Sequence, residues 1–556
     1  MSNFDDEREA NIARNKALLA QLDISMSNLG IPTPAEKAKS KAKPVQPAKR
    51  VKRERGTGTP LPARETRSST RQKRPVINPN ETPAQKKKRE KEEEEARRKE
   101  EEERLEAEER EREAKRPRHQ DLDLDTLGEE LDDSQIATLR ANFELVLKTV
   151  HPRREGDPDR FTFDDDGVDQ EAEVVSDLRK RLGKMKVVAR AKVCTDRIYS
   201  AAYHPEPTKD LIFFGDKHGQ LGIWDARAPS DAVDDDHPKS KDTKEDGKYW
   251  RLQAHWPATS RSSISSVKFD PRDAHSVFTS AYDRTIRTLS FTSGISREIF
   301  STSDERILIH SIDLPPTGNE MWISDSGGSL THLDLREDKS KARYYGVSTQ
   351  KVGSVSINPA NPNFLLTASN NRFLRIWDAR NLDLLKTLDD EENIQVIEDF
   401  LTKSEDGSSC LKSSWEHGKA INSAYWDPRG RSIVSTCYDD KLRFWDVDPS
   451  FMTRPSRFPT SRPKNDVSHD CQTGRWLTVF KAQWSPNPDV YPHITVGNML
   501  HSLDIYSCKG ELLASLSDPS RITAVQAVTC SHPSVVERAA SGNGSGRCVL
   551  WAPVDS

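Results

Sequence analysis

The sequence predicts an all-β fold, a seven-bladed β-propeller of small antiparallel sheets, preceded by a long charged extension. The first observation is a recurring phrase: LGIWDAR ends at Arg227, LRIWDAR at Arg380 and LRFWDVD at Asp448, and LTHLDLR, ending at Arg336, is a degenerate copy. The second is that two strand-like runs with alternating apolar residues precede each copy. The third is the even spacing of positions 289, 333 and 377, at the period of about 40 to 45 residues that is typical of a four-stranded propeller blade.

From Val187 onward the chain divides into seven such units. Each unit has an opening strand that ends in proline, a second strand that ends in small residues, and a third strand that closes with Trp-Asp or its equivalent. The opening strands are RIYSAAYHP (197–205), SISSVKFDP (263–271), RILIHSIDLP (306–315), KVGSVSINP (351–359), AINSAYWDP (420–428), LTVFKAQWSP (477–486) and ITAVQAVTCSHP (522–533). Joining the units into a ring removes exposed sheet edges and leaves two faces and a central channel.

The composition indicates that part of the chain is not packed. Of 556 residues, 34% are hydrophobic and 31% are charged, which is lean for a wholly folded protein. The net charge of -4 hides basic and mixed-charge runs before about residue 120 and acidic patches after it. We therefore expect a disordered basic tail with a charged helix over residues 1–120, a helical and acidic linker over 121–186, and the propeller over 187–556.

The tail contains four compact basic clusters, at residues 48–55, 71–75, 86–89 and 114–118. Such clusters serve as nuclear-import signals or as phosphate-binding arms, although any single one is also compatible with a solvated run. Residues 86–116 alternate Glu with Arg and Lys at helical spacing, which predicts a solvated helical spacer without a coiled-coil seam. Residues 7–22 are either a short partner-binding helix or a transient helix in the tail. Four clusters in one tail favour the nucleus.

The linker contains two predicted helices. Residues 124–148 carry an apolar face that includes Ile136, Leu139 and Phe143, and Asp133 or Ser134 is the expected N-cap. The position of this helix just before the repeats suggests that it packs on the folded domain or is offered to a partner. The second predicted helix, residues 171–182, leads into the first strands.

No pattern in the sequence indicates catalysis. The N-terminus lacks a secretory signal and no long apolar run occurs, so we expect a soluble intracellular protein. The seven cysteines include no CxxC pair, which predicts reduced and mostly buried thiols, and we expect neither a metal nor a cofactor. GNGSG (542–546) resembles part of a phosphate loop but has no following Lys-Ser or helix, so a turn is expected. The chain is therefore expected to be a binding protein and not an enzyme.

Two sets of cations are candidate recognition surfaces. The first is Arg227, Arg336 and Arg380, which follow the third strands and therefore share one rim, where an arginine can present a fixed cationic fork. Pairing of these arginines with the Asp of a neighbouring blade is the alternative. The second set precedes the opening strands, on the opposite face, and consists of Arg197, Arg261, Lys351, Lys419 and Arg475. A ring of cations around one mouth suits a polyanion; scattered solvated charges are the alternative.

The repeats resemble WD repeats, and some units also carry the histidine and the turn aspartate of that family, at His255, His417, Asp283 and Asp439. The segments AAYHP, SINPANPNFLLTASNNRFLRIWDAR and WLTVFKAQWSP are similar to the fungal DNA damage-binding WD-repeat proteins. These are related to human WD-repeat protein seventy-six and to the small subunit of the ultraviolet-damaged-DNA-binding complex. In that resemblance Arg475 and Trp476 take the place of a hairpin wedge that fills the gap left by a flipped lesion, although the aromatic-polar-histidine order of the hairpin is not kept.

The resemblance implies a nuclear protein that binds single- and double-stranded DNA and prefers ultraviolet-damaged sites. The expected DNA-binding residues are Arg197, Lys351, Lys419, Arg475 and Trp476. The Trp-Asp-x-Arg rim also resembles the docking box of WD-repeat substrate receptors of cullin-type ubiquitin ligases, which gives Arg227, Arg336 and Arg380 a possible adaptor as partner. A chromatin scaffold that binds histone tails or repair proteins is a third hypothesis. No membrane and no small-molecule substrate are expected as partners.

Overall fold

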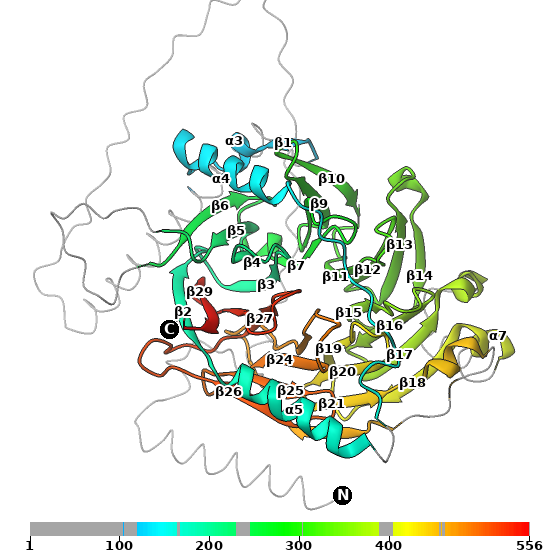
Figure 1. Cartoon of the computed structure of the whole chain (residues 1–556). Coiled ribbons are helices and arrows are strands. Elements are labelled where there is room, and N and C mark those ends of the chain that lie inside the picture. The colour runs from blue at the N-terminus through cyan, green and yellow to red at the C-terminus, as the bar shows by residue number, and fades with distance from the viewer. Residues whose placement is uncertain are drawn as a thin grey trace, which may run out of the picture. The chain divides into compact units, whose positions relative to one another are not determined.

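The computed structural model describes residue 104 and residues 119–163, 167–229, 245–302, 304–387, 404–454, 458 and 462–554. All of them belong to one compact unit, Lys87–Ser556. The predicted helix at 7–22, the four basic clusters and all but one residue of the charged stretch 86–116 lie outside the described residues. In the described part, seven antiparallel sheets are arranged in a ring (Figure 1). The predicted seven-bladed propeller is confirmed.

Each blade has four strands, and the first strand of each blade lines the centre of the ring. The first strands are β3 (Ile198–Tyr203), β7 (Ile264–Phe269), β11 (Ile309–Asp313), β15 (Val352–Ile357), β19 (Ile421–Trp426), β23 (Gln483–Trp484) and β27 (Val528–Ser531). The second strands are β4 (Leu211–Asp216), β8 (Ser276–Ala281), β12 (Glu320–Asp325), β16 (Phe364–Ser369), β20 (Ser432–Cys437), β24 (His493–Gly497) and β28 (Ala539–Gly542).

The third and fourth strands form the outer half of each blade. The third strands are β5 (Gln220–Asp225), β9 (Thr285–Ser290), β13 (Ser329–Asp334), β17 (Phe373–Asp378), β21 (Lys441–Asp446), β25 (Leu503–Ser507) and β29 (Arg547–Pro553). The fourth strands are β6 (Lys248–Gln253), β10 (Ile295–Ser301), β14 (Arg343–Gly346), β18 (Leu411–Glu416), β22 (Asn465–Ser468), β26 (Leu512–Leu516) and, in the seventh blade, β2 (Met185–Lys192). Because β2 precedes the first blade and pairs with β29 from Met185↔Pro553 to Lys192↔Arg547, the two ends of the repeat region close the ring together.

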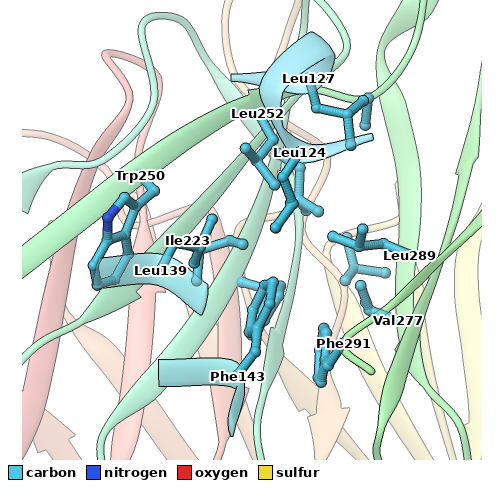
Figure 2. Close-up of a cluster of buried hydrophobic side chains, with 14 of the residues drawn as sticks. Leu124, Leu127, Leu139, Phe143, Ile223, Trp250, Leu252, Val277, Leu289 and Phe291 are labelled. Atoms are coloured by element: carbon cyan, nitrogen blue, oxygen red, sulfur yellow. The ribbon is translucent and has the colours of Figure 1, made fainter. Parts of the chain in front are cut away.

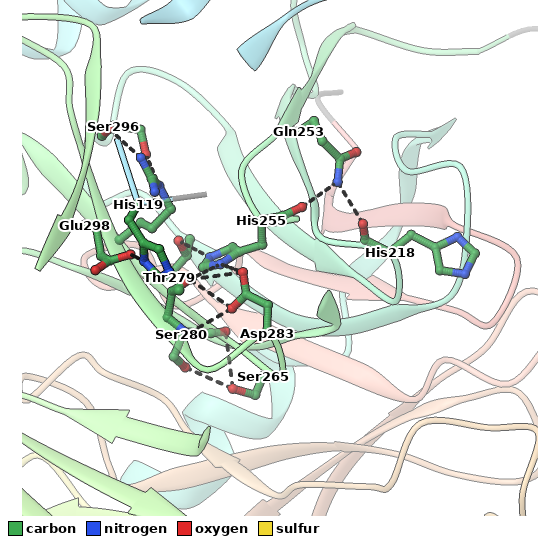
Figure 3. Close-up of polar contacts among 12 residues, drawn as sticks. His119, His218, Gln253, His255, Ser265, Thr279, Ser280, Asp283, Ser296 and Glu298 are labelled. Atoms are coloured by element: carbon green, nitrogen blue, oxygen red, sulfur yellow. Dashed lines mark hydrogen bonds and ion pairs between the residues drawn. The ribbon is translucent and has the colours of Figure 1, made fainter. Parts of the chain in front are cut away.

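The Trp-Asp motifs stabilise the blades from within, through buried side chains that contact neighbouring strands of the same blade. Trp224 and Trp377 are completely buried, and the Trp377 indole Nε1 donates to the Thr367 hydroxyl at 2.9 Å. In the second blade, the His255 ring lies 3.1 Å from Asp283 Oδ2 and 2.9 Å from the Thr279 hydroxyl, all buried (Figure 3). These polar groups satisfy one another inside the sheet, as buried polar groups must. The family histidine and aspartate of this blade are therefore structural.

The segment before the repeats is packed on the propeller. β1 (Leu122–Asp123) pairs with β10 as a fifth strand, and α3 (Leu124–Leu127) and α4 (Asp133–Val146) cover the first and second blades. Figure 2 shows the buried side chains of these helices among those of the two blades. Helix α4 begins after Asp132, whose carboxylate accepts the Gln135 N–H at 2.8 Å in a capping box. The predicted cap at Asp133 or Ser134 was wrong by one or two residues, because Asp132 has the extended backbone of a cap and Asp133 is already helical.

The second predicted helix is α5 (Val168–Leu182), which begins three residues earlier than the sequence indicated. Val175, Leu178 and Leu182 pack against the sixth and seventh blades beside Leu513 and Leu516. Five short helices complete the described part: η5 (Ser260–Ser262), η6 (Lys339–Lys341), η7 (Ala379–Thr387), α7 (Glu405–Cys410) and η8 (Pro449–Thr453). No helix among the described residues is both long and apolar enough to cross a membrane.

Between α4 and α5, residues 147–163 form a strap across one end of the ring. The His151 and Arg153 N–H groups donate to the carbonyls of Asp273 and Pro271 in the second blade, and Gly156 donates to Pro428 in the fifth. Arg154 reaches Asn487 of the sixth blade at 2.9 Å. The strap therefore bridges the loops that follow the first strands of several blades. The sequence analysis did not anticipate it.

The structure also tests the predictions for the cysteines, the GNGSG stretch and the opening strand of the sixth unit. All seven cysteines are free thiols and six are buried, as predicted. The GNGSG stretch is the turn between β28 and β29, as predicted, with Gly546 at a φ of 80° that favours glycine. The opening strand of the sixth unit is shorter than predicted, since only Gln483–Trp484 pairs with β24. Just before this pairing, the Ala482 N–H donates to the Thr436 hydroxyl of the fifth blade at 3.1 Å.

Candidate nucleic-acid interface

Strand order assigns each predicted cation to one of two faces of the propeller. We call one face the entry face: on it the first strands begin, and the second strands connect to the third strands. The exit face carries the loops after the first strands, the ends of the third strands, and the strap. Arg197, Arg261, Lys351, Lys419 and Arg475 precede first strands and lie on the entry face, whereas Arg227, Arg336 and Arg380 follow third strands and lie on the exit face.

On the entry face, Arg197 joins the first blade to the loop that opens the sixth. Its guanidinium lies 5.0 Å from the centre of the Tyr199 ring and donates to the Tyr199 hydroxyl at 2.8 Å. The same guanidinium donates to the Arg475 carbonyl at 3.2 Å. Arg197 is therefore half-buried and fixed, with its charge held at the rim of the channel, while Arg475 itself is exposed.

Trp476 is the most exposed aromatic residue of the described chain, with 80% of its surface accessible. The Arg475 guanidinium lies 5.3 Å from the centre of its ring. Gly474 before them has a φ of 59° and nothing within 4 Å of where a Cβ would be, so the loop stands away from the blade. An exposed indole offers a partner a large apolar surface, and tryptophan is enriched at protein interfaces.

Leu500 is a second exposed apolar residue of the same blade, which the sequence analysis missed. It lies in the turn between β24 and β25, on the entry face, and 84% of its surface is accessible. The turn is held by the Asn498 side chain, which accepts the Leu500 N–H at 2.8 Å. A leucine at the tip of a tight polar turn, in MLHS, was the only sign in the sequence.

The other predicted cations differ in their surroundings. Lys419 and Arg261 are exposed beside their blades, as an ion-binding surface requires. Lys351 is only partly exposed, and burial lowers its pKa. Lys351 lies close enough to His310 that, together with burial, its charge helps lower the pKa of that imidazole to about 2. Lys351 thus belongs to the channel mouth more than to the outer rim.

Aromatic rings from the first three blades line one part of the same mouth. Tyr282 lies edge-on to Tyr199, with ring centres 6.2 Å apart, and to His310, with centres 5.0 Å apart. Arg197 covers the Tyr199 ring. Cations interleaved with aromatic rings are the side chains that proteins use for phosphates and unpaired bases. The sequence analysis missed the rings because strand periodicity does not reveal which positions meet across the channel.

On the exit face, the three arginines are paired within their own blades. Arg336 holds Asp334 with two hydrogen bonds of 2.9 and 2.7 Å, and Arg380 holds Asp378 with the same fork at 2.9 and 2.7 Å. Arg227 pairs at 2.5 Å with Asp210, which directly precedes β4 of the same blade. The alternative of pairing with a neighbouring blade is therefore wrong for these contacts. The Arg336 and Arg380 side chains remain 67% and 58% exposed, so each fork is fixed and accessible.

The ring of seven blades, with its buried Trp-Asp phrases and its histidine-aspartate network, defines a WD-repeat β-propeller. The family model described as "WD domain, G-beta repeat" matches residues 339–378 and 408–446. In the described residues no cluster of three or more His, Cys, Asp or Glu side chains is placed to hold a metal ion.

Curated relatives identify the family. A Cryptococcus neoformans protein named DNA damage-binding protein CMR1 is 36% identical over 486 residues, which cover 78% of this chain and 80% of the relative. The protein of the same name from Mycosarcoma maydis is 31% identical over 68% of this chain and 73% of its own. The one from Aspergillus oryzae is 29% identical over 99% of both chains. The chain belongs to this fungal family of DNA damage-binding WD-repeat proteins, as the resemblance indicated.

Proposed function

We propose that the protein binds DNA, single- and double-stranded, through its entry face, that it prefers ultraviolet-damaged sites, and that it acts in the nucleus as a binding protein without catalysis. The observation that carries the proposal is the loop of Arg475 and Trp476, which presents an exposed indole and is held by the Arg197 guanidinium at the Arg475 carbonyl. The names of the relatives support it, since all those cited are called DNA damage-binding.

In this proposal the cations set affinity and the aromatic residue sets preference. Arg197, Lys351, Lys419 and Arg475 contact phosphates, a contribution that is independent of sequence and weakens with salt. Trp476 stacks where a base has been extruded, which costs less at a damaged step because the stack there is already weakened. The basic tail adds unspecific phosphate contacts.

The cationic rim is tested by reversing three charges together, in Lys351→Glu, Lys419→Glu and Arg475→Glu. We expect weaker binding to every duplex and a plot of log affinity against log salt that is less steep by up to about 3. The matched control reverses Lys180, Lys184 and Lys186, which are exposed on and after α5, and changes the net charge equally. If the rim variant binds as tightly as the control, the entry face is not the DNA site.

Trp476→Ala tests the damage preference separately. We expect the gel-shift affinity for irradiated duplex to fall by about tenfold or more, the loss of one stacked base, while affinity for intact duplex changes little. Trp476→Phe keeps a ring and should retain much of the preference. Equal losses on irradiated and intact duplex would assign Trp476 to general binding and contradict the wedge.

The contribution of the tail is measured with a protein that begins at residue 119, because β1, α3, α4 and α5 pack on the blades and must be kept. We expect it to retain the preference for irradiated duplex with lower total affinity. If it loses all DNA binding, the tail is the DNA element.

A second candidate function uses the exit face, where Arg336 and Arg380 present fixed forks to a partner. We propose that this rim docks on the adaptor of a cullin-type ubiquitin ligase, with Arg227 beside it; chromatin proteins are a further class of partner for the same surfaces. Arg227→Ala with Arg380→Ala in a folded protein should abolish adaptor pull-down and leave DNA binding intact. Unchanged pull-down would exclude the rim.

A further inference from the structure

The central channel contains a cavity of about 520 Å³. All seven blades line it, and the strap residues 150–154 lie at its exit end. Since the strap bridges several blades there, we take the entry face as the open end. A cavity of this volume is of the size that small ligands occupy.

Lysines from three blades follow one another along this channel. Lys351 lies at the entry mouth, Lys481 inside the cavity, and Lys268 toward the strap. Burial first, and then the charges of Lys351 and Lys268, lower the pKa of Lys481 to about 8. The charges of Lys351 and Lys268 therefore both act on the Lys481 ammonium, and an anion beside Lys481 would offset this repulsion.

The acidic groups of the cavity are already engaged near the strap. Asp313 accepts the Ile357 N–H at 2.8 Å and lies 3.4 Å from the Lys268 ammonium and 3.8 Å from the Arg153 guanidinium. Asp270, the other carboxylate in the lining, is held by Arg272 at 2.7 Å. Among the residues that the structure describes, no hydrogen bond or ion pair joins Lys481 to a partner. One cation inside the cavity thus has no counter-charge.

We propose that the channel binds a phosphate group, with Lys481 as its principal ligand, Lys351 at the entrance and the Tyr425 hydroxyl in the lining. Two sources share this chemistry: a free phosphate ester or inorganic phosphate, and the terminal phosphate of a nucleic-acid strand that enters from the entry face. A phosphate carries close to two negative charges at neutral pH and accepts several hydrogen bonds at once. The site goes beyond the proposed DNA-binding function, because Lys481 is not among the residues assigned to the rim.

Calorimetric titration of the full chain with inorganic phosphate and with sulfate tests the site. We expect saturable binding of both anions, weakened about tenfold or more in Lys481→Met, which keeps the length of the stem and removes the charge. Lys481→Arg should retain most of the binding and so reports whether the loss follows from charge. Lys441→Met is the matched control, because that lysine is paired with Asp466 on the surface. Absence of saturable binding, or equal binding in Lys481→Met and the parent, would overturn the proposal.

The pH dependence gives a second readout. Sulfate does not titrate near neutrality, so its affinity reports the protein. The titratable groups that interact electrostatically with Lys481 are Lys351, Lys268 and His310, and Asp313 and Tyr425 line the same cavity. Because the Lys481 ammonium loses its proton as the pH rises through about 8, sulfate affinity should fall between pH 7 and pH 9 in the parent, and this fall should be smaller in Lys481→Met. A parallel fall in both proteins would contradict the role of Lys481.

Short oligonucleotides distinguish the two sources. If a 5′-phosphorylated strand binds more tightly than its unphosphorylated twin, and this gain disappears in Lys481→Met, the ligand is a strand end. If the gain is absent while inorganic phosphate still binds through Lys481, the ligand is a small phosphate. Duplex DNA affinity of Lys481→Met is measured alongside, so that a failure of the DNA-binding proposal is seen separately from a failure of the channel site.

Discussion

Two tryptophans show how position decides what one residue type does. Trp377 ends a third strand, is completely buried and donates to Thr367, so it stabilises its blade. Trp476 lies in a loop, is largely exposed and has the Arg475 guanidinium near its ring. The same side chain is therefore structural in one place and available to a partner in the other.

Substitution of these two residues should change the free energy of unfolding by very different amounts. Trp377→Ala leaves a large cavity and should lower the free energy of unfolding by about 3 to 5 kcal/mol. Trp476→Ala removes little buried surface and should change it by less than about 0.5 kcal/mol. Urea denaturation followed by circular dichroism measures both. A large loss of stability in Trp476→Ala would mean that the indole packs on the protein in solution.

Buried histidines predict weaker stability in mild acid. Burial lowers the pKa of His417, His493 and His532 to about 4, from an ordinary value near 6.5. The unfolded chain therefore binds protons that the folded chain does not, and stability that is complete above pH 6.5 is lost as the pH falls toward 4. Each histidine contributes about 1 kcal/mol per pH unit in this range.

The urea midpoint should accordingly fall from pH 7.5 to pH 5. Burial raises the pKa of Glu206, but the hydrogen bonds with Thr208, Thr149 and His151 outweigh this and lower it to about 2. The Glu206 carboxyl therefore titrates below this window. His417→Gln should make the decline less steep, because one titrating group is removed. Equal midpoints at both pH values would show that the histidines are accessible to protons in the folded state.

At the scale of elements, the strap follows directly after α4, which is docked on the second blade. Phe143 is buried and stacks on Phe291 of the second blade, with ring centres 4.5 Å apart. Leu145, two residues further, is 39% exposed. The helix therefore has one face that holds it to the blade and one that does not.

Phe143→Ala should loosen α4 and expose the strap. We expect a loss of about 3 to 5 kcal/mol in the local docking energy, seen as faster hydrogen exchange over residues 133–163. Leu145→Ala is the control and should leave exchange there unchanged. If Phe143→Ala exchanges like the parent, the polar contacts of the strap hold it without the helix.

At the scale of the whole molecule, the seventh blade is built from both ends of the repeat region. Its fourth strand, β2, comes from the N-terminal side and pairs with β29 along its length. Deleting residues up to 193 removes β2, leaves β29 as an open edge and exposes buried apolar residues of that strand, such as Val549 and Trp551, to water.

A protein that begins at residue 194 should therefore aggregate or unfold, whereas one that begins at residue 119 should remain monomeric with the parent's melting temperature within a few degrees. Size-exclusion chromatography and thermal denaturation compare the two. A folded, monomeric protein without β2 would show that ring closure is not needed for stability.

The repeat phrases were sufficient to predict the number of blades, because each phrase encodes one buried third strand and the period fixes the unit. LRIWDAR also predicted a third strand that ends just before Arg380, and the structure has β17 end at Asp378. Within 124–148, the helix predicted to begin at Asp133 or Ser134 was nearly right, because its apolar spacing indicates a packed face and α4 is Asp133–Val146; the separate short helix α3 was not predicted. The surface on which α4 packs was not predictable, because an apolar face shows that a helix is packed but not against which other element.

The sequence by itself determined the local elements: the strands, the turns and the number of repeats. Through strand order it also assigned two sets of cations to opposite faces. Only the tertiary structure decided what meets across space. The strap at the exit end, the Arg197 contact with the Arg475 loop, and the approach of Lys351, Lys481 and Lys268 each join residues that are far apart in the chain. Ring closure brings these residues together. Neither the periodicity nor the composition of the sequence indicates how far apart two residues lie in space when they are distant in the chain.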